Sequence, residues 1–227
     1  MSIKPLYLLA DSQLLFWKEA DRPFIARIRE DLESAEPTAA YVGASNGDDP
    51  GFYSIFEAAM ETIGVSQRRM IAARPSNDDL AFLQSANLVL LAGGSVRQGW
   101  EAFEQNGVKD LILQRRYDGI ILVGVSAGAV QLGLGALIEP PAESSAVKKV
   151  DLFRFAPFYI SAHEEQEAWW DLKLLVSSSE AGDRGIGIPF GGGAIYHPEG
   201  SLEPVRKSLT EFLKTDDQVS ESVLLPQ

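Results

Sequence analysis

A serine flanked by glycines stands at the end of an apolar segment in the middle of the chain. Residues 119–125 are aliphatic or glycine, and Gly124-Val-Ser126-Ala-Gly128 has the G-x-S-x-G spacing of a nucleophile elbow. In such an elbow a buried strand turns sharply into a helix, and the glycines let the two elements approach closely. The serine Oγ is then exposed at the helix N-terminus, where free N–H groups favour negative charge. The pattern therefore predicts a nucleophilic serine beside a site that stabilises an oxyanion.

The alternative is that Ser126 only caps a helix, as serines at strand-to-helix turns often do. The surrounding sequence favours the elbow. Residues 120–123 form a continuous aliphatic run typical of a buried strand, and residues 127–134 are compatible with a helix.

A serine nucleophile needs a general base within hydrogen-bond reach, and the chain has only two histidines, His163 and His197. His163 follows a strand-like segment and opens a helix expected to run from Ala162 to about Val176, with Trp169, Trp170, Leu172 and Leu174 on its buried side. That places His163 on the same rim of a parallel sheet as Ser126. His197 lies beyond a glycine-rich turn. We therefore favour His163 as the base.

The base in turn needs an orienting acid, and the oxyanion needs N–H donors. The loop after Ile138 offers Glu139 and Glu143, of which Glu139 is preferred. Glu164 and Glu165 adjoin the histidine, but we expect them to be solvated carboxylates in the first turn of a helix. The N–H of Ala127 is one natural oxyanion donor, and the Gly93-Gly94 turn after the preceding strand offers a second unless it is only a tight turn.

Strand-like and helix-like segments alternate along the chain, which predicts a mostly parallel sheet with helices on both faces and ligands at the carboxyl ends of the strands. The expected strands are 5–10, 38–44, 69–73, 87–92, 120–123, 136–138, 185–188 and 193–196, the last two as a pair joined by a turn at 189–192. The expected helices are 23–33 with Asp21 as a cap, 52–63, 80–86 after a capping box at 76–79, 96–105, 108–116 and 127–134. We expect one domain over residues 1–207, followed by a short helix or loose tail over 208–227.

Composition narrows the classes of function. The chain of 227 residues carries 20 Lys and Arg against 32 Asp and Glu, a formal charge of −12 that disfavours nucleic acids and anionic membranes as partners. The absence of cysteine excludes disulfides and thiolate catalysis, and no cluster has metal-ligand spacing. With no spanning segment or signal peptide, we expect a cytoplasmic protein without a cofactor or metal. The oligomeric state stays open, with a homodimer as one option.

Taken together, these features resemble the peptidase E and cyanophycinase family of serine peptidases over roughly residues 6–196. The resemblance is carried by the segments 41–50 (YVGASNGDDP), 90–95 (LLAGGS) and 124–129 (GVSAGA) and by His163. It implies a three-layer α/β/α, class I glutamine amidotransferase-like (flavodoxin-like) fold. It further implies a Ser-His-acid hydrolase with Ser126 as nucleophile, His163 as base, Glu139 or Glu143 as acid, and the N–H groups of Gly94 and Ala127 as oxyanion donors.

Known family members act on bonds following aspartate, either in dipeptides with N-terminal Asp or in the β-Asp-Arg units of cyanophycin. The resemblance therefore implies a small peptide or isopeptide bond as substrate, possibly next to aspartate. The sequence departs from the family around the histidine, where cyanophycinases have Gln-His-Phe followed by arginines and this chain has Ala162-His-Glu-Glu-Gln166. Arg97 is the nearest cation to pair with a substrate carboxylate, although an arginine in a first helical turn is often only solvated. Two alternatives stay open: a non-catalytic ligand- or partner-binding member of the fold, and an α/β-hydrolase esterase.

Overall fold

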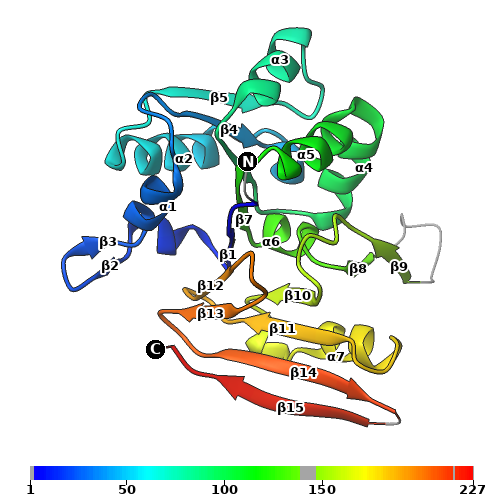
Figure 1. Cartoon of the computed structure of the whole chain (residues 1–227). Coiled ribbons are helices and arrows are strands. Elements are labelled where there is room, and N and C mark those ends of the chain that lie inside the picture. Colours follow the sequence, from blue (N-terminus) through cyan, green and yellow to red (C-terminus); the bar gives the residue numbers. More distant parts are fainter. Residues whose placement is uncertain (1–2, 139–146, 217, 227) are drawn as a thin grey trace.

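A seven-stranded sheet forms the centre of the computed structural model, which describes residues 3–138, 147–216 and 218–226 (Figure 1). The strands lie in the order β13-β12-β1-β7-β6-β4-β5. The five strands β1, β7, β6, β4 and β5 are parallel to one another. Strands β12 and β13 extend the β1 side of the sheet in antiparallel orientation. The bounds are β1 Leu6–Leu9, β4 Thr38–Val42, β5 Gln67–Ile71, β6 Leu88–Leu91, β7 Ile121–Val125, β12 Gly193–Tyr196 and β13 Leu202–Val205.

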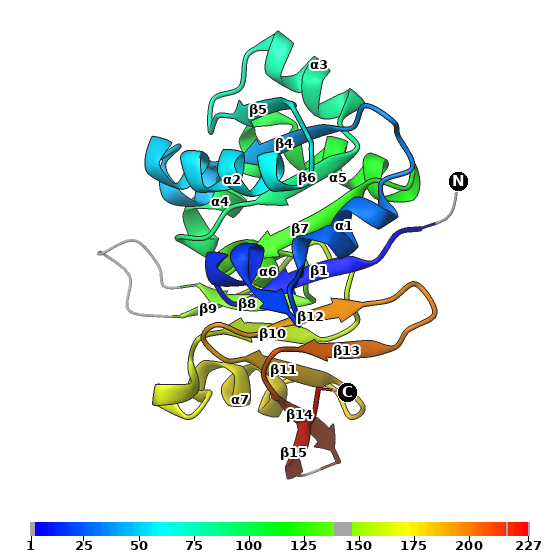
Figure 2. The same ribbon diagram turned by 90° about the vertical axis from the view of Figure 1, so that its left-hand side faces the viewer.

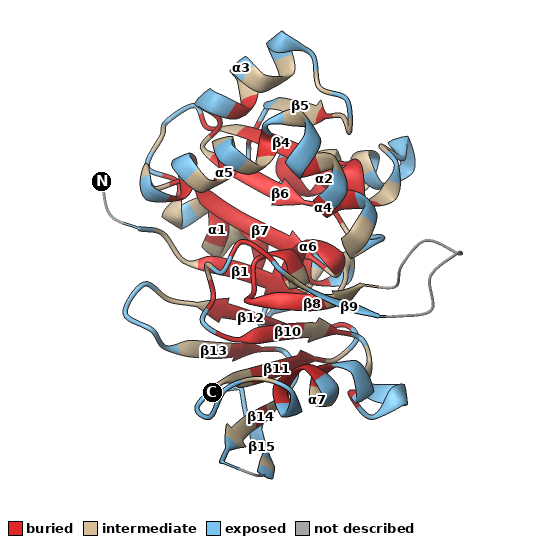
Figure 3. Cartoon of the chain, turned by 90° about the vertical axis from the view of Figure 1, so that its right-hand side faces the viewer, coloured by how far each residue is buried: buried red, intermediate tan, exposed pale blue. Residues whose placement is uncertain are grey.

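Successive side chains of the central strands enter two different cores. On β1, Leu6 and Leu8 pack into one core, while Tyr7 and Leu9 pack into the other, as the two-residue period of a strand requires. The first core is covered by α3 (Asn77–Ser85), α4 (Val96–Asn106), α5 (Val108–Tyr117) and α6 (Ala127–Gln131). The second is covered by α1 (Ile25–Asp31), α2 (Pro50–Thr62) and the 3₁₀ helix Ser12–Phe16. The predicted three-layer arrangement around a mostly parallel sheet is confirmed (Figures 2 and 3).

Most helix ends follow from local sequence. Ser76 and Asp79 form the expected capping box at the start of α3, and Gly107 ends α4 in a left-handed conformation at φ 78°. The expected cap at Asp21 is wrong. Arg22–Pro23 is instead strand β3, which pairs with β2 (Lys18–Glu19), so α1 begins later, at Ile25.

A second sheet, in the order β10-β11-β14-β15, lies on the side of the central sheet where β12 and β13 form the antiparallel edge (Figure 1). Its strands are β10 Tyr159–Ala162, β11 Arg184–Ile188, β14 Leu209–Thr215 and β15 Gln218–Leu224. The helix or loose tail expected over residues 208–227 is therefore wrong. Leu209 and Phe212 on β14 are buried in two different apolar clusters. Strand β14 pairs with β11 and with β15, so the end of the chain is a hairpin within the second sheet.

The strand pair expected from segments 185–188 and 193–196 is also wrong. Both segments are strands, but β11 pairs with β10 and β14, whereas β12 pairs with β1 and β13. The turn between them, closed by the Gly192 N–H donating to the Pro189 carbonyl at 2.8 Å, carries the chain from one sheet to the other. Turn residues in the sequence mark a change of direction but do not identify the partner strand.

The helix after His163 starts later than its periodicity predicts. Ala168 and Trp169 have left-handed backbones at φ 52° and 60°, so the regular helix α7 runs only from Trp170 to Ser177. Trp169 and Leu172 are buried as expected, but Trp170 and Leu174 are exposed, which corrects their predicted burial.

A short antiparallel pair, β8 (Gly135–Ile138) and β9 (Lys148–Asp151), adjoins the elbow helix and β10 (Figure 1). In the described part of the chain, no helix has the length and apolar character needed to cross a membrane.

Candidate active site

Ser126 stands where β7 ends and α6 begins, at the carboxyl edge of the central sheet. Its backbone adopts φ 50° and ψ −112°, a conformation that is strained for a residue with a side chain. The Ser126 N–H donates to the Leu9 carbonyl of neighbouring β1 at 2.8 Å, which holds the turn to the sheet. Although Ser126 occupies the N-cap position of α6, its side chain makes no capping hydrogen bond. The Oγ is therefore directed to another partner.

The glycines of the motif are required by close packing. A Cβ on Gly124 would lie 2.5 Å from the Gly128 carbonyl oxygen, and a Cβ on Gly128 would overlap the backbone carbonyl of Leu91 on β6. Gly93, which follows β6, lies against Ser126, since a Cβ there would be 3.3 Å from the serine Cβ. Side chains at these positions would push α6 away from the sheet and displace Ser126.

His163 is the partner of Ser126. Its Nε2 lies 2.8 Å from the serine Oγ, although the two residues are 37 positions apart in the chain. His163 directly follows β10, and its N–H donates to the Ile188 carbonyl at the end of β11 at 2.8 Å. Its backbone also lies in the left-handed region, at φ 51°. The second sheet therefore positions the His163 imidazole beside Ser126, at the carboxyl ends of the central strands.

His197 lies at the other end of the central strands, where the parallel strands begin. It follows β12, whose last residue Tyr196 pairs with Leu6 at the start of β1, whereas Ser126 lies beyond the end of β1. Its Nε2 is 3.0 Å from Glu203 Oε2. Of the two histidines, only His163 is therefore placed beside the serine.

The predicted acids Glu139 and Glu143 lie outside the described residues. The two glutamates next to His163 have structural partners, which corrects the expectation that they are merely solvated. Glu164 accepts from the Ser161 hydroxyl at 2.6 Å and from the Asp171 N–H at 2.7 Å, and so fixes the start of α7. Glu165 accepts from the Phe190 N–H at 3.0 Å.

The Gly93-Gly94 turn packs tightly against the segment after β4. Gly94 has φ 124°, and a Cβ there would overlap the Ser45 carbonyl, whose oxygen also accepts from the Ser95 N–H at 2.7 Å. Among the described residues, the Gly94 N–H donates to no protein acceptor. The Ala127 N–H, as the first of α6, has no acceptor within its own helix.

A buried glutamine that the sequence did not single out ties these segments together. Gln131, in the last turn of α6, is fully buried, and its Nε2 donates to the Ser45 Oγ at 3.1 Å and to the Val96 carbonyl at 3.3 Å. The sequence does not indicate this role, because the partner Ser45 is distant in the chain and only the fold brings it next to Gln131.

The role considered for Arg97, pairing with a substrate carboxylate, stays a prediction. The Arg97 Nη1 lies 3.5 Å from Glu101 Oε1, one turn along α4, and the arginine side chain is 40% exposed. Such an exposed i, i+4 pair contributes little to stability.

A cavity of about 360 Å³ adjoins His163 between α6, β8, β10 and α7. Its lining combines aliphatic side chains with polar ones, and three acidic side chains join His163 there: Glu164, Glu167 and Asp171. The sequence shows this acidic segment, but whether its carboxylates face the histidine depends on where α7 begins. Within the described ranges, no group of three or more potential ligands is arranged to hold a metal ion.

The model of peptidase family S51 matches residues 7–173, which include the elbow, the Gly-Gly turn and His163. No curated protein matches the chain.

Solved structures with a similar fold include a peptidase from an acI-B1 Actinobacterium and a protein assigned as peptidase E from Listeria monocytogenes EGD-e. The first has a TM-score of 0.68 at 14% identity and covers 99% of this chain and 95% of its own. The second has a TM-score of 0.63 at 14% identity and covers 98% of this chain and 100% of its own. At this identity the two structures show a shared fold, and the family match extends over most of the sequence. The chain belongs to peptidase family S51.

Proposed function

We propose that the protein is a serine peptidase that cleaves a small peptide or isopeptide bond, with Ser126 as nucleophile and His163 as general base. The observation that carries the proposal is the 2.8 Å contact between Ser126 Oγ and His163 Nε2, made by a serine that does not cap its own helix. A hydroxyl is a weak nucleophile at neutral pH unless a base accepts its proton as it attacks. The neutral imidazole meets this need when Nδ1 carries the proton and Nε2 accepts from the hydroxyl.

In the proposed reaction, Ser126 Oγ attacks the carbonyl carbon of the scissile bond as its proton passes to His163 Nε2. The carbonyl oxygen becomes an oxyanion, which the N–H groups of Gly94 and Ala127 stabilise. The imidazolium then gives its proton to the leaving amine, and an acyl-enzyme forms on Ser126. A water molecule, deprotonated by the same imidazole, releases the acid product and regenerates the serine. We propose Glu139, with Glu143 as the alternative, as the carboxylate that orients the histidine.

The geometry and the family favour this function over the two alternatives. A non-catalytic member would have no reason to hold Ser126 in a strained backbone within hydrogen-bond distance of a histidine. The match to a peptidase family favours a peptidase over an α/β-hydrolase esterase.

A fluorophosphonate probe tests the nucleophile and the base. We expect wild type to be labelled at one site, Ser126→Ala to be unlabelled, and His163→Ala to react at least about a hundredfold more slowly, because general-base catalysis contributes that much. His197→Gln is the matched control and should label like wild type, because His197 lies at the other end of the central strands. Intact-mass spectrometry measures the labelling rates. Folded wild type that is not labelled, or labelling retained in Ser126→Ala, would refute the proposal.

A further inference from the structure

The outer edge of the second sheet is formed by β15, and its shape and chemistry fit a second copy of the same chain. We infer that two copies associate through antiparallel pairing of their β15 strands, around a two-fold axis at Glu221. This pairing would join the second sheets of the two copies into one continuous sheet. The inference concerns a surface of the second sheet and does not depend on the proposed function.

Strand β15 has a free edge. It is the last strand in the order β10-β11-β14-β15, and among the described residues no strand pairs with its outer side (Figure 1). Outside its pairing with β14, none of residues 219–224 makes a backbone–backbone hydrogen bond within the part of the chain that the structure describes. In an antiparallel pair the N–H and C=O groups of alternate residues point outward. Such a row of unpaired backbone groups is a template for a further strand.

An apolar groove lies beside one half of this edge. A cavity of about 270 Å³ separates α7 from β14 and β15, and its apolar lining comes from Trp170, Leu174, Phe212 and Val219. Trp170 is 69% exposed and Leu174 is 46% exposed, although both are large apolar side chains on a regular helix. Apolar side chains gathered on the surface in this way are typical of interaction sites.

The other half of the edge carries apolar side chains that lie outside the groove. Side chains two positions apart on a strand point to the same face, so Val223 lies on the same face as Val219 and Glu221. Val223 is 59% exposed and does not line the groove, since it stands about 13 Å beyond Val219 along the strand. Leu225, just after the strand, is exposed as well. One end of β15 therefore has an apolar groove, and the other end has exposed apolar side chains.

Antiparallel pairing brings these unlike ends together. When Glu221 faces Glu221 of the second copy, position 219 faces position 223, and the same contact occurs twice by symmetry. Val223 of the second copy then lies at the groove formed by Trp170, Leu174 and Val219, as in an isologous interface. A parallel arrangement would instead place groove against groove. The two-fold arrangement is therefore the one that covers both apolar parts of the surface.

The charges at the centre of the strand are also self-complementary. Glu221 Oε2 lies 3.4 Å from Lys173 Nζ on α7, and the two side chains are exposed. An axis at Glu221 brings two carboxylates and two ammonium groups together, so the cluster carries no net charge and the repulsion between the carboxylates is offset. Complementary charges of this kind fix the register of an interface.

The size of the contact predicts a weak dimer. The residues of β15, Leu225 and the part of α7 that lines the groove amount to about half of the roughly 20 to 30 residues per partner in a standard interface. The formal charge of −12 on each copy also opposes association. We therefore expect a reversible dimer that dissociates on dilution.

A charge exchange tests the interface. Glu221→Lys leaves four cations at the axis and Lys173→Glu leaves four anions, so each variant should dimerise at least about tenfold more weakly than wild type. The double variant Lys173→Glu/Glu221→Lys restores the neutral cluster and should dimerise within about threefold of wild type. Tyr117→Lys, at an exposed residue of α5, is the control and should leave association unchanged. Sedimentation velocity over a range of about 1 to about 200 µM measures the dissociation constants.

The absence of cysteine from the chain allows the axis to be located. Facing residues of an antiparallel pair have Cα atoms about 4.5 to 5.5 Å apart, a separation that a disulfide spans. Mild oxidation should therefore convert Glu221→Cys into a covalent dimer. Val223→Cys should stay monomeric under the same conditions, because its two thiols would lie about 13 Å apart along the strands. Intact-mass spectrometry without reductant measures the crosslinked fraction.

The outcomes decide for or against this interface. A protein that stays monomeric over the whole concentration range would overturn the inference. A dimer that both single charge variants leave unchanged would do the same, since it would use another surface, as would a double variant that does not regain association. Circular dichroism establishes folding, which an exposed ion pair affects little. If a charge variant does not fold, the crosslinking of Glu221→Cys against Val223→Cys decides. None of these results depends on whether Ser126 is labelled.

Discussion

The position of Ser126 depends on residues that carry no chemistry. Its strained backbone, at φ 50°, is held by the Leu9 carbonyl on one side and by close packing of α6 on β6 on the other. The close packing is possible only because Gly128 has no side chain, since a Cβ there would overlap the backbone of Leu91. A backbone carbonyl in a central strand cannot move aside as a flexible side chain would.

We therefore expect Gly128→Ala to destabilise the fold by about 3 kcal/mol, the upper part of the range for overpacked cores, and to abolish labelling of Ser126 at temperatures where the variant is folded. Gly107→Ala is the comparison. Its φ of 78° makes alanine unfavourable by about 1 kcal/mol, but no atom lies near the added methyl, so labelling should persist. Urea denaturation and probe labelling measure the two effects. A Gly128→Ala variant labelled at the wild-type rate would show that the close packing does not position the serine.

At the level of single residues, the sequence predicted the features that depend on residue types at short spacings. The elbow was predictable because G-x-S-x-G couples a serine to the small neighbours its turn requires. His163 was singled out because only two histidines exist, but the reason given for its position was wrong, since the preceding strand β10 belongs to the second sheet and not to the parallel sheet that holds Ser126. The carboxylates of Glu167 and Asp171 were not assigned to the cavity, because their direction depends on the left-handed residues Ala168 and Trp169, which periodicity does not reveal.

At the level of elements, three segments that are remote in sequence are joined around the candidate oxyanion site. Gln131 on α6 donates to Ser45, next to the Gly94 turn, and to Val96 at the start of α4. There is little free space around this junction, since a Cβ on Gly99 would overlap the Ser45 hydroxyl. We therefore expect Gln131 to hold α6 and the Gly94 turn in position relative to each other.

We expect Gln131→Leu to lower the free energy of unfolding by about 2 kcal/mol, because it leaves buried acceptors without their donor, and to slow labelling of Ser126 while Ser126 stays intact. Ser45→Ala removes only one of the two bonds and should cost about 1 kcal/mol. Because the two residues share a hydrogen bond, the double variant should lose less than the sum of the single losses. Denaturation of the four proteins gives the coupling. Strict additivity, or unchanged labelling in Gln131→Leu, would argue against the network.

The elements themselves were predicted better than their partners. Strands and helices of the central sheet follow from aliphatic runs and caps such as Ser76. The pairing of β11 with β14, and the hairpin of β14 with β15, did not follow, because polar alternating segments such as 218–224 fit an exposed edge strand as well as a loose tail. Strand partners are decided by contacts between distant parts of the chain.

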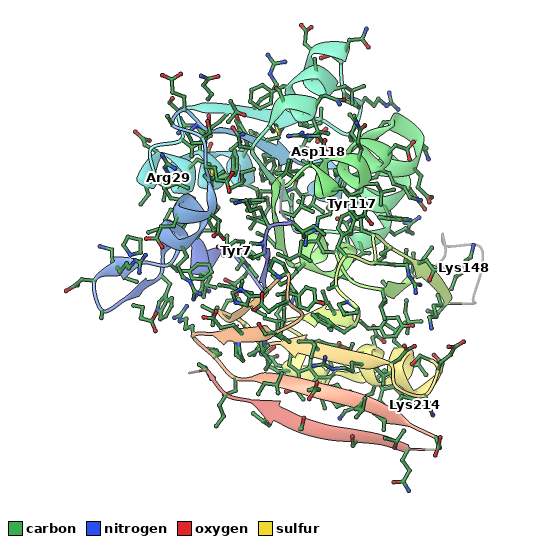
Figure 4. The ribbon with its side chains drawn as sticks, viewed as in Figure 1. Tyr7, Arg29, Tyr117, Asp118, Lys148 and Lys214 are labelled. Carbon is green, nitrogen blue, oxygen red and sulfur yellow. The ribbon has the colours of Figure 1, made fainter. Side chains whose placement is uncertain are left out.

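At the level of the whole molecule, the first helix is joined to the antiparallel edge of the central sheet by charged groups. Arg27 on α1 donates to both carboxylate oxygens of Glu203 on β13, at 2.6 and 2.8 Å, and His197 contacts the same carboxylate. Tyr7, labelled in Figure 4, lies on β1, the strand that neighbours β12. Its hydroxyl donates to Asp31 at 2.6 Å, and burial raises the pKa of Tyr7. These contacts join segments separated by up to 176 positions.

This cluster makes stability depend on pH with a defined sign. The hydrogen bonds from Arg27, followed by that from His197, hold the pKa of Glu203 below its ordinary value of 4.5. A carboxyl whose pKa is lower in the folded state stabilises the fold above its unfolded pKa and loses this contribution as pH falls through the lowered folded value.

We therefore expect Glu203→Gln to be less stable than wild type by about 1 kcal/mol at pH 7, a modest figure because the pair is about one-third exposed. The difference should narrow below about pH 4.5. Urea denaturation at pH 7, 5 and 3.5 measures it, with Glu61→Gln as the control for net charge. A difference that stays constant down to pH 3.5 would mean that Glu203 joins the two segments by packing and not by its charge.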